Sequence, residues 1–169
     1  MIKVKLLKEQ ILAPVKYMYH VTSEDRVDSI MKSGLVVNSN KGKSLGTLEY
    51  LQQVYDIIPV FLSLYTKDDN QKGHYSDGVL LKINVSGLKL VADVGMLVEE
   101  GAYVEEDYIW FEEENTPYQL ESYVGDNGEI YFEDLNTNKG LIKACIDVTK
   151  TAACKQSIAP DRIQVIGKV

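Results

Sequence analysis

Residues 17–36, "YMYHVTSEDRVDSIMKSGLV", change from a strand pattern to a helix pattern within a few residues. Residues 15–20 alternate and are rich in Val and Tyr, which predicts a β-strand. A capping hydroxyl on Thr22 or Ser23, two acidic residues and an apolar face then predict a helix of about three turns that ends at Gly34. His20, one of two histidines in the chain, lies at the predicted joint between strand and helix.

The composition is that of an ordinary globular protein. The chain has 169 residues, which fits one domain spanning residues 1–169. Apolar residues make up 45% and charged residues 25%, and the net charge is −7. This charge makes non-specific binding to nucleic acid unlikely, because such binding depends on Lys and Arg that neutralise phosphates. The net charge does not exclude binding of a small phosphate-bearing ligand by a few local residues.

Targeting and metal signals are absent from the sequence. No apolar run approaches the roughly 20 residues of a membrane span, and the first residues lack the features of a signal peptide. Cys145 and Cys154 have no metal-ligand spacing, and neither do His20 and His74. We therefore expect a cytoplasmic protein that binds no metal, has no membrane association and keeps its thiols reduced.

Strand patterns dominate the rest of the chain. A second helix is expected at 47–58, between a loop at 38–46 and Pro59, and residues 93–106 are ambiguous. Further strands are expected at 60–64, 79–85 and 107–113, in a hairpin at 120–134, and in the last third around a turn at Pro160. The pattern predicts an α+β fold with a bent, mostly antiparallel sheet and a few helices near the N-terminal half.

Two groups of residues outside the opening stretch are candidates for a catalytic role. Acidic residues gather at 99–114, either as a solvated face or with one Glu beside Trp110 as a catalytic carboxylate of raised pKa. Cys145 and Cys154 lie in apolar stretches that we interpret as strands, which favours buried, inert thiols over nucleophiles.

The opening stretch resembles the start of the ADP-ribosyltransferase-like superfamily, which includes RNA 2′-phosphotransferases and DNA-targeting ADP-ribosyltransferase toxins. The matching positions, in chain order, are Tyr19, His20, Thr22, Ile30-Met31 and Gly34-Leu35. Residues 60–63, "VFLS", look like the second strand of that group, and residues 78–90 like its next strand and turn. The terminal "SIAPDRIQVIGKV" is similar to the ending of bacterial and phage members.

This resemblance implies an NAD-binding protein with an ADP-ribosyltransferase-like fold. Such a protein cleaves the nicotinamide–ribose bond of NAD, its substrate, and transfers ADP-ribose to a macromolecular acceptor that the sequence does not identify. By the resemblance, His20 is the catalytic residue that hydrogen-bonds the ribose, with Thr22 beside it and Ser63 on the second strand. Tyr65 or Tyr75 would stack on the nicotinamide ring.

The sequence departs from the family pattern where a late-strand Glu is expected. That position falls near Thr151, and no acidic residue lies between Asp147 and Asp161. A Glu from 105–114 would have to substitute for it, which leaves the enzyme assignment open. The alternatives are a catalytically silent nucleotide- or protein-binding module, such as a phage or plasmid accessory protein, and an RNA 2′-phosphotransferase. The latter is disfavoured because residues 37–59 contain no Arg for the phosphates.

Overall fold

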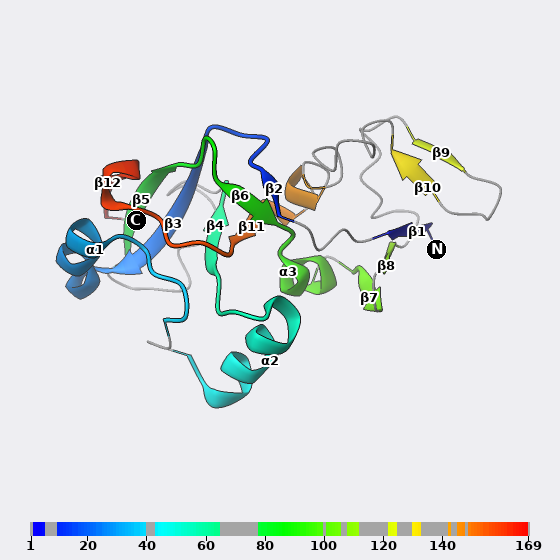
Figure 1. Ribbon diagram of the computed structural model, residues 1–169, viewed down its shortest axis with the longest axis horizontal. Coiled ribbons are helices and arrows are strands. Elements are labelled where there is room, and N and C mark those ends of the chain that lie inside the picture. Colours follow the sequence, from blue (N-terminus) through cyan, green and yellow to red (C-terminus); the bar gives the residue numbers. More distant parts are fainter. Residues whose placement is uncertain are drawn as a thin grey trace.

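The protein has an α+β fold with mostly antiparallel sheets and few helices (Figure 1). A computed structural model describes most of the chain. The described residues are 2–5, 10–39, 43–64, 78–99, 101–105, 108–111, 122–124, 130–132, 142, 145–147 and 149–168. The predicted fold class is confirmed at this level.

The main sheet contains seven strands in the order β12-β5-β3-β4-β11-β6-β2, and every pairing is antiparallel. Its strands are β2 (Ile11–Leu12), β3 (Tyr17–Ser23), β4 (Val60–Ser63), β5 (Gly78–Asn84), β6 (Lys89–Val91), β11 (Thr151–Cys154) and β12 (Ile163–Lys168). Strands from both ends of the chain thus flank β3, β4 and β11 at the centre.

Two smaller sheets lie to the right of the main sheet in Figure 1. Their strands are β1 (Ile2–Lys5), β7 (Tyr103–Glu105) and β8 (Tyr108–Phe111) in one sheet, and β9 (Ser122–Val124) and β10 (Ile130–Phe132) in the other. The antiparallel pairing of β9 with β10 agrees with the hairpin predicted at 120–134. The turn of that hairpin lies outside the described residues.

The helices are short and are not confined to the N-terminal half. They are η1 (Glu24–Arg26), α1 (Val27–Ser33), α2 (Leu45–Tyr55), α3 (Val94–Glu99) and η5 (Pro160–Arg162). The start of α2 is earlier than predicted because the Ser44 hydroxyl accepts a hydrogen bond from the Thr47 amide at 3.3 Å and caps the helix. Residues 145–147 are helical, so the strand predicted around Cys145 is wrong.

Strand β3 continues further than the alternating pattern indicated. All seven of its residues pair with β5, from Tyr17 opposite Asn84 to Ser23 opposite Gly78. His20 therefore lies in the middle of a strand and not at a joint, and Thr22 belongs to the strand and caps no helix. The extension follows from tertiary pairing, which local propensity does not include.

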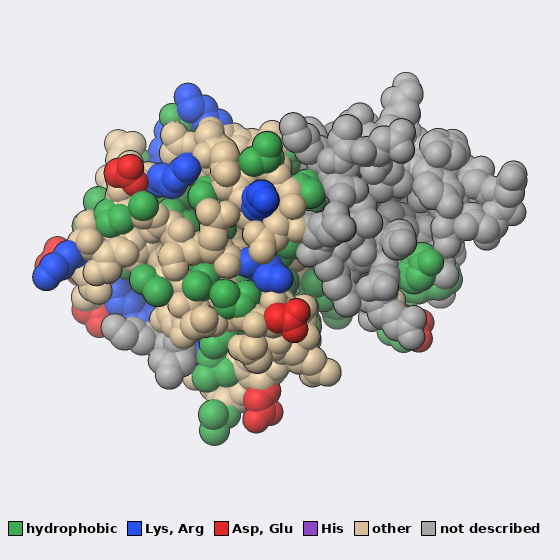
Figure 2. All heavy atoms as spheres, viewed as in Figure 1, with side chains coloured by type: hydrophobic (Ala, Val, Ile, Leu, Met, Phe, Trp, Pro, Cys, Tyr) green, Lys and Arg blue, Asp and Glu red, His purple; other side chains and the backbone are tan. Residues whose placement is uncertain are grey.

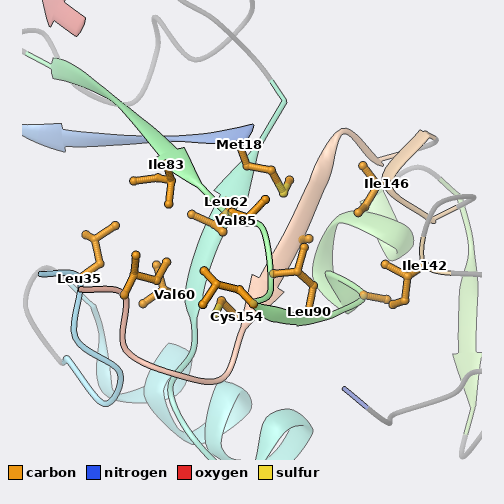
Figure 3. Packing of buried hydrophobic residues seen from close by; sticks show 14 of the residues in the cluster. Met18, Leu35, Val60, Leu62, Ile83, Val85, Leu90, Ile142, Ile146 and Cys154 are labelled. Atoms are coloured by element: carbon orange, nitrogen blue, oxygen red, sulfur yellow. The ribbon is translucent and has the colours of Figure 1, made fainter. Parts of the chain in front are cut away.

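The core lies on both faces of the main sheet. Because side chains alternate along a strand, Val60 and Leu62 of β4 face one cluster of buried side chains and Phe61 faces another. Figure 3 shows the first cluster, in which Leu35 and Val60 lie near each other. Helix α2 covers the second cluster with Leu51 and Tyr55.

The visible surface is mixed in charge. In Figure 2, Lys and Arg side chains and Asp and Glu side chains are interspersed over the described half of that face. No helix among the described residues is long and apolar enough to cross a membrane.

Candidate functional site

The sheet opens between β3 and β4. The two strands pair at Tyr19 opposite Ser63, and no further pair joins them in the described structure. The Phe61 carbonyl, two residues along β4, accepts a hydrogen bond from Nδ1 of His20 at 2.8 Å. Because a carbonyl cannot donate, Nδ1 carries the hydrogen and Nε2 of the neutral ring has a free lone pair. The side chain of His20 thus links β3 to β4 at a point where the two strands have no backbone pairing.

A cavity of about 760 Å³ lies at this opening. It is lined by the end of β3, by η1 and α1, by the segment 34–39, by Lys43 and by the start of β4. Its polar side chains include those of His20, Thr22, Arg26, Ser29, Asn38 and Lys43. This volume lies within the range of small-molecule and cofactor sites, about 300 to 1,000 Å³.

The electrostatics of the cavity are positive around His20. Burial lowers the pKa of His20, hydrogen bonding to the Phe61 carbonyl opposes this, and the charges of Lys43 and Arg26 lower it further. Burial, followed by the charge of Arg26, likewise lowers the pKa of Lys43. The imidazole is therefore held neutral at the edge of a cationic cavity.

One wall of the cavity is tied to the C-terminal segment. The backbone amide and carbonyl of Leu35 exchange hydrogen bonds with those of Ile158 at 2.9 and 2.8 Å. Gly34 has a φ of +83°, and a Cβ on it would overlap the Ile158 carbonyl. The Val37 amide donates to the Ser157 hydroxyl at 3.2 Å. The Gly-Leu and Ile-Ala-Pro segments noted in the sequence are therefore direct neighbours.

The other end of the same wall is tied to the segment that enters β4. The Asn38 amide donates to the Ile58 carbonyl at 2.8 Å, and the Asn38 side-chain oxygen accepts from the Ile58 amide at 3.1 Å. Asn38 has a φ of +62°, a conformation that asparagine tolerates better than most residues. The wall is thus held in place without a ligand.

The structure brings together two of the five predicted site residues. His20 and Thr22 line the cavity, and Thr22 is 3% exposed. Ser63 is the register neighbour of Tyr19, but strand alternation places its side chain on the sheet face opposite His20, and it does not line the cavity. Tyr65 and Tyr75 lie outside the described residues.

The position at which the resemblance led us to expect a late-strand Glu is Thr151. Thr151 pairs with Ser63, so it lies in the third strand of the row β3-β4-β11. Its Oγ1 atom is buried and does not meet hydrogen-bond geometry with any described residue, but it lies near enough to the Asp93 carboxylate to favour the charged form of that group. The position that was inferred from the C-terminal motif therefore lies in the centre of the sheet.

The hydroxyl of Thr151 acts on the carboxylate of Asp93. Burial raises the pKa of Asp93, and hydrogen bonding to the Met96 amide and the influence of the Thr151 hydroxyl lower it in part. Asp93 is 6% exposed, and its Oδ1 accepts from the Met96 amide at 3.2 Å. This is the geometry of an N-cap, so Asp93 serves the start of α3.

Arg26 was not predicted as a site residue, and Lys43 falls in the loop predicted at 38–46. Arg26 reaches the cavity because η1 turns the chain immediately after β3. Lys43 reaches it from the segment before α2, and its Nζ donates to the Ser39 carbonyl at 3.4 Å. In the sequence, Arg26 is only a basic residue six positions after His20. This spacing does not indicate a site unless the fold is known.

The other candidate groups that the structure describes do not line the cavity. Cys145 and Cys154 are free and buried, and burial raises the pKa of the Cys145 thiol to about 12. Glu99 and Glu105 are exposed, in keeping with a solvated acidic face, while residues 112–114 lie outside the described structure. The described residues contain no group of three His, Cys, Asp or Glu side chains that could hold a metal ion.

No protein-family model matches the chain, and no curated protein matches it.

Proposed function

We propose that this protein is an NAD-binding, ADP-ribosyltransferase-like protein whose cleft holds the ribose next to nicotinamide against His20. The observation that carries the proposal is the neutral ring of His20, fixed by the Phe61 carbonyl at the opening between β3 and β4. A ribose hydroxyl can donate to the free lone pair of Nε2, and the Thr22 side chain lines the same cavity.

The arrangement of strands supports the resemblance on which this proposal rests. Of the four sequence motifs compared with the family, the first begins on β3, the second is β4 and the third includes β5, and both of these strands pair with β3. The fourth, at the end of the chain, contains Ile158, which bridges to Leu35 of the first. Leu35 and Ile158 are more than 100 residues apart in sequence, and Leu35 also lines the cavity beside His20.

In the transfer reaction, the bond between C1′ of the ribose and the nicotinamide nitrogen breaks, and its electron pair leaves with nicotinamide. A nucleophile of the acceptor then bonds to C1′ and releases its proton. His20 would orient the ribose for this step, and the fixed dipoles of the cleft would stabilise the charge that develops. The acceptor is a macromolecule, in keeping with a cavity that opens at the sheet surface.

A second candidate is a catalytically silent nucleotide-binding protein. The observation that favours it is Thr151, which cannot stabilise an oxocarbenium-like charge as a carboxylate does. Asp25 is the carboxylate that lines the described cavity, and it is exposed. Binding without turnover would then be the whole activity of the cleft.

The two candidates separate when binding and chemistry are measured together. The protein would be titrated calorimetrically with NAD and ADP-ribose and, separately, incubated with labelled NAD and cell lysate. Saturable binding with nicotinamide release and labelled macromolecules supports transfer, whereas binding alone supports the silent candidate. His20→Gln should weaken NAD binding by about tenfold or more, the value of one hydrogen bond to a positioned group. Lys32→Gln, on the exposed side of α1, is the control. No binding of either compound would overturn the proposal.

A further inference from the structure

Two positive side chains in the cavity have no ion-pair partner among the residues that the structure describes. Arg26 and Lys43 both line it and are both half-buried. Their charges act on each other and on His20, since Arg26 lowers the pKa of Lys43 and both lower the pKa of His20 in addition to the effect of burial. Over the described ranges neither forms an ion pair; the ion pair present there joins Lys168 to Glu24.

Two like charges placed this close to each other are unfavourable unless an anion offsets them. Like charges within electrostatic reach of one another repel, and partial burial removes water that would screen them. Asp25 also lines the cavity, but counting Arg26, Lys43 and Asp25 gives 2 − 1 = +1 before His20 is considered. The whole chain has a net charge of −7, so this local excess runs against the average of the molecule.

The surroundings of the two cations suit an anion with several oxygens. The Ser29 hydroxyl and the Asn38 segment line the same cavity, and hydrogen bonds to Ile58 and Ser157 fix that segment. Guanidinium and ammonium groups form short, strong hydrogen bonds to phosphate oxygens. A volume of about 760 Å³ leaves room for much more than a phosphate ion beside them.

We infer that Arg26 and Lys43 form a subsite for the diphosphate of a nucleotide whose ribose lies against His20. The inference rests on the proposed function for the position of that ribose. The ligand class is a nucleoside diphosphate ester, whose diphosphate oxygens would form the ionic contacts with Arg26 and Lys43.

The test uses calorimetric titration of the full chain with inorganic pyrophosphate, ADP, ADP-ribose, NAD and uncharged adenosine. The variants are Arg26→Gln, Lys43→Gln and the double variant, with Lys32→Gln as a charge-matched control outside the cavity. Each single change should weaken ADP and ADP-ribose binding by about ten- to a hundredfold, the range for a hydrogen bond to a charged group. The control should bind as the parent does, and adenosine binding should be unaffected by all variants. Thermal unfolding would show that every variant is folded.

The outcomes separate this inference from the proposed function. If pyrophosphate and ADP bind through Arg26 and Lys43 but NAD does not bind, the subsite stands and the NAD assignment falls. If NAD binds equally to the parent and to the double variant, the subsite is overturned and the NAD assignment stands. Failure of pyrophosphate, ADP and ADP-ribose to bind the parent at millimolar concentration overturns the subsite.

Discussion

The two edges of strand β4 have opposite characters. Toward β11 the ladder runs through four residue pairs, from Ser63 opposite Thr151 to Cys154 opposite Val60. Toward β3 a single pair remains in the described structure, and the Phe61 carbonyl is bonded by a side chain instead of a strand. The paired edge is closed and structural, while the open edge leaves polar groups and a cavity available to a ligand.

The comparison also concerns charge. At the open edge lie Arg26, Lys43 and a neutral His20, whereas the carboxylate near the closed edge, Asp93, caps a helix. The positively charged side chains thus line the open edge, whereas the buried carboxylate of Asp93 lies near the closed edge. Substitutions at each edge of β4 test how far the two edges act independently.

The largest effect is expected from placing a carboxylate on the closed edge. Thr151→Glu would put an acid where Oγ1 is buried and Asp93 is near, and a pKa shift of about 3 units there would cost about 4 kcal/mol of unfolding free energy. Urea unfolding measures this, and Thr151→Gln separates charge from size. A stable Thr151→Glu protein that releases nicotinamide from NAD would show that the two edges form one site.

The next effect concerns the wall of the open edge. Gly34→Ala should cost about 3 kcal/mol, because alanine resists a φ of +83° and its Cβ would meet the Ile158 carbonyl. Gly46 is the control, since it lies in α2 with open space around it, and Gly46→Ala should stabilise by up to about 1 kcal/mol. Urea unfolding gives both values. A neutral Gly34→Ala change would mean that the wall can move away from the C-terminal segment.

A smaller effect is expected at Asp93. Asp93→Ala should lose about 1 kcal/mol of unfolding free energy because the amide of Met96 loses its cap, whereas Asp93→Asn keeps the cap. Burial raises the pKa of Asp93 in the folded state, so the parent loses stability as the pH rises above the ordinary Asp value of about 3.9. Asp93→Asn lacks this loss, so its stability relative to the parent should increase as the pH rises. Thermal unfolding at several pH values measures this difference. A constant difference between the two would show that Asp93 is not desolvated.

Several elements of the fold follow from local sequence pattern. The strands β4, β5 and β8 lie where apolar runs predicted them, and the helix that ends at Gly34 is present because Gly34 is free to take a positive φ. The extent of β3 was not predictable, since Thr22 and Ser23 become strand only by pairing with β5. The helical residues around Cys145 were mistaken for strand because short apolar runs look alike in both states.

The candidate site was predictable in part. His20 and Thr22 were selected from a motif, and both line the cavity. Arg26 and Lys43 could not be selected, because a solvated charge and a charge in a cavity look the same in sequence and differ only in what the fold places beside them. The ADP-ribosyltransferase-like topology, the role of NAD and a cytoplasmic location stay predictions.

The smallest effect is expected from the pH dependence that His20 causes. The same group can report whether a ligand binds at the open edge. The pKa of His20 is lowered, so the unfolded chain binds its proton first as the pH falls below the ordinary value of about 6.5. The parent should therefore lose stability below that pH, and His20→Gln should lose less. The chain has two histidines, so the ring signal that disappears in the NMR spectrum of His20→Gln is that of His20. Adding ADP should raise its pKa, because a diphosphate on Arg26 and Lys43 offsets the two charges that lower it. An unchanged pKa under saturating ADP would mean that the ligand binds away from the open edge.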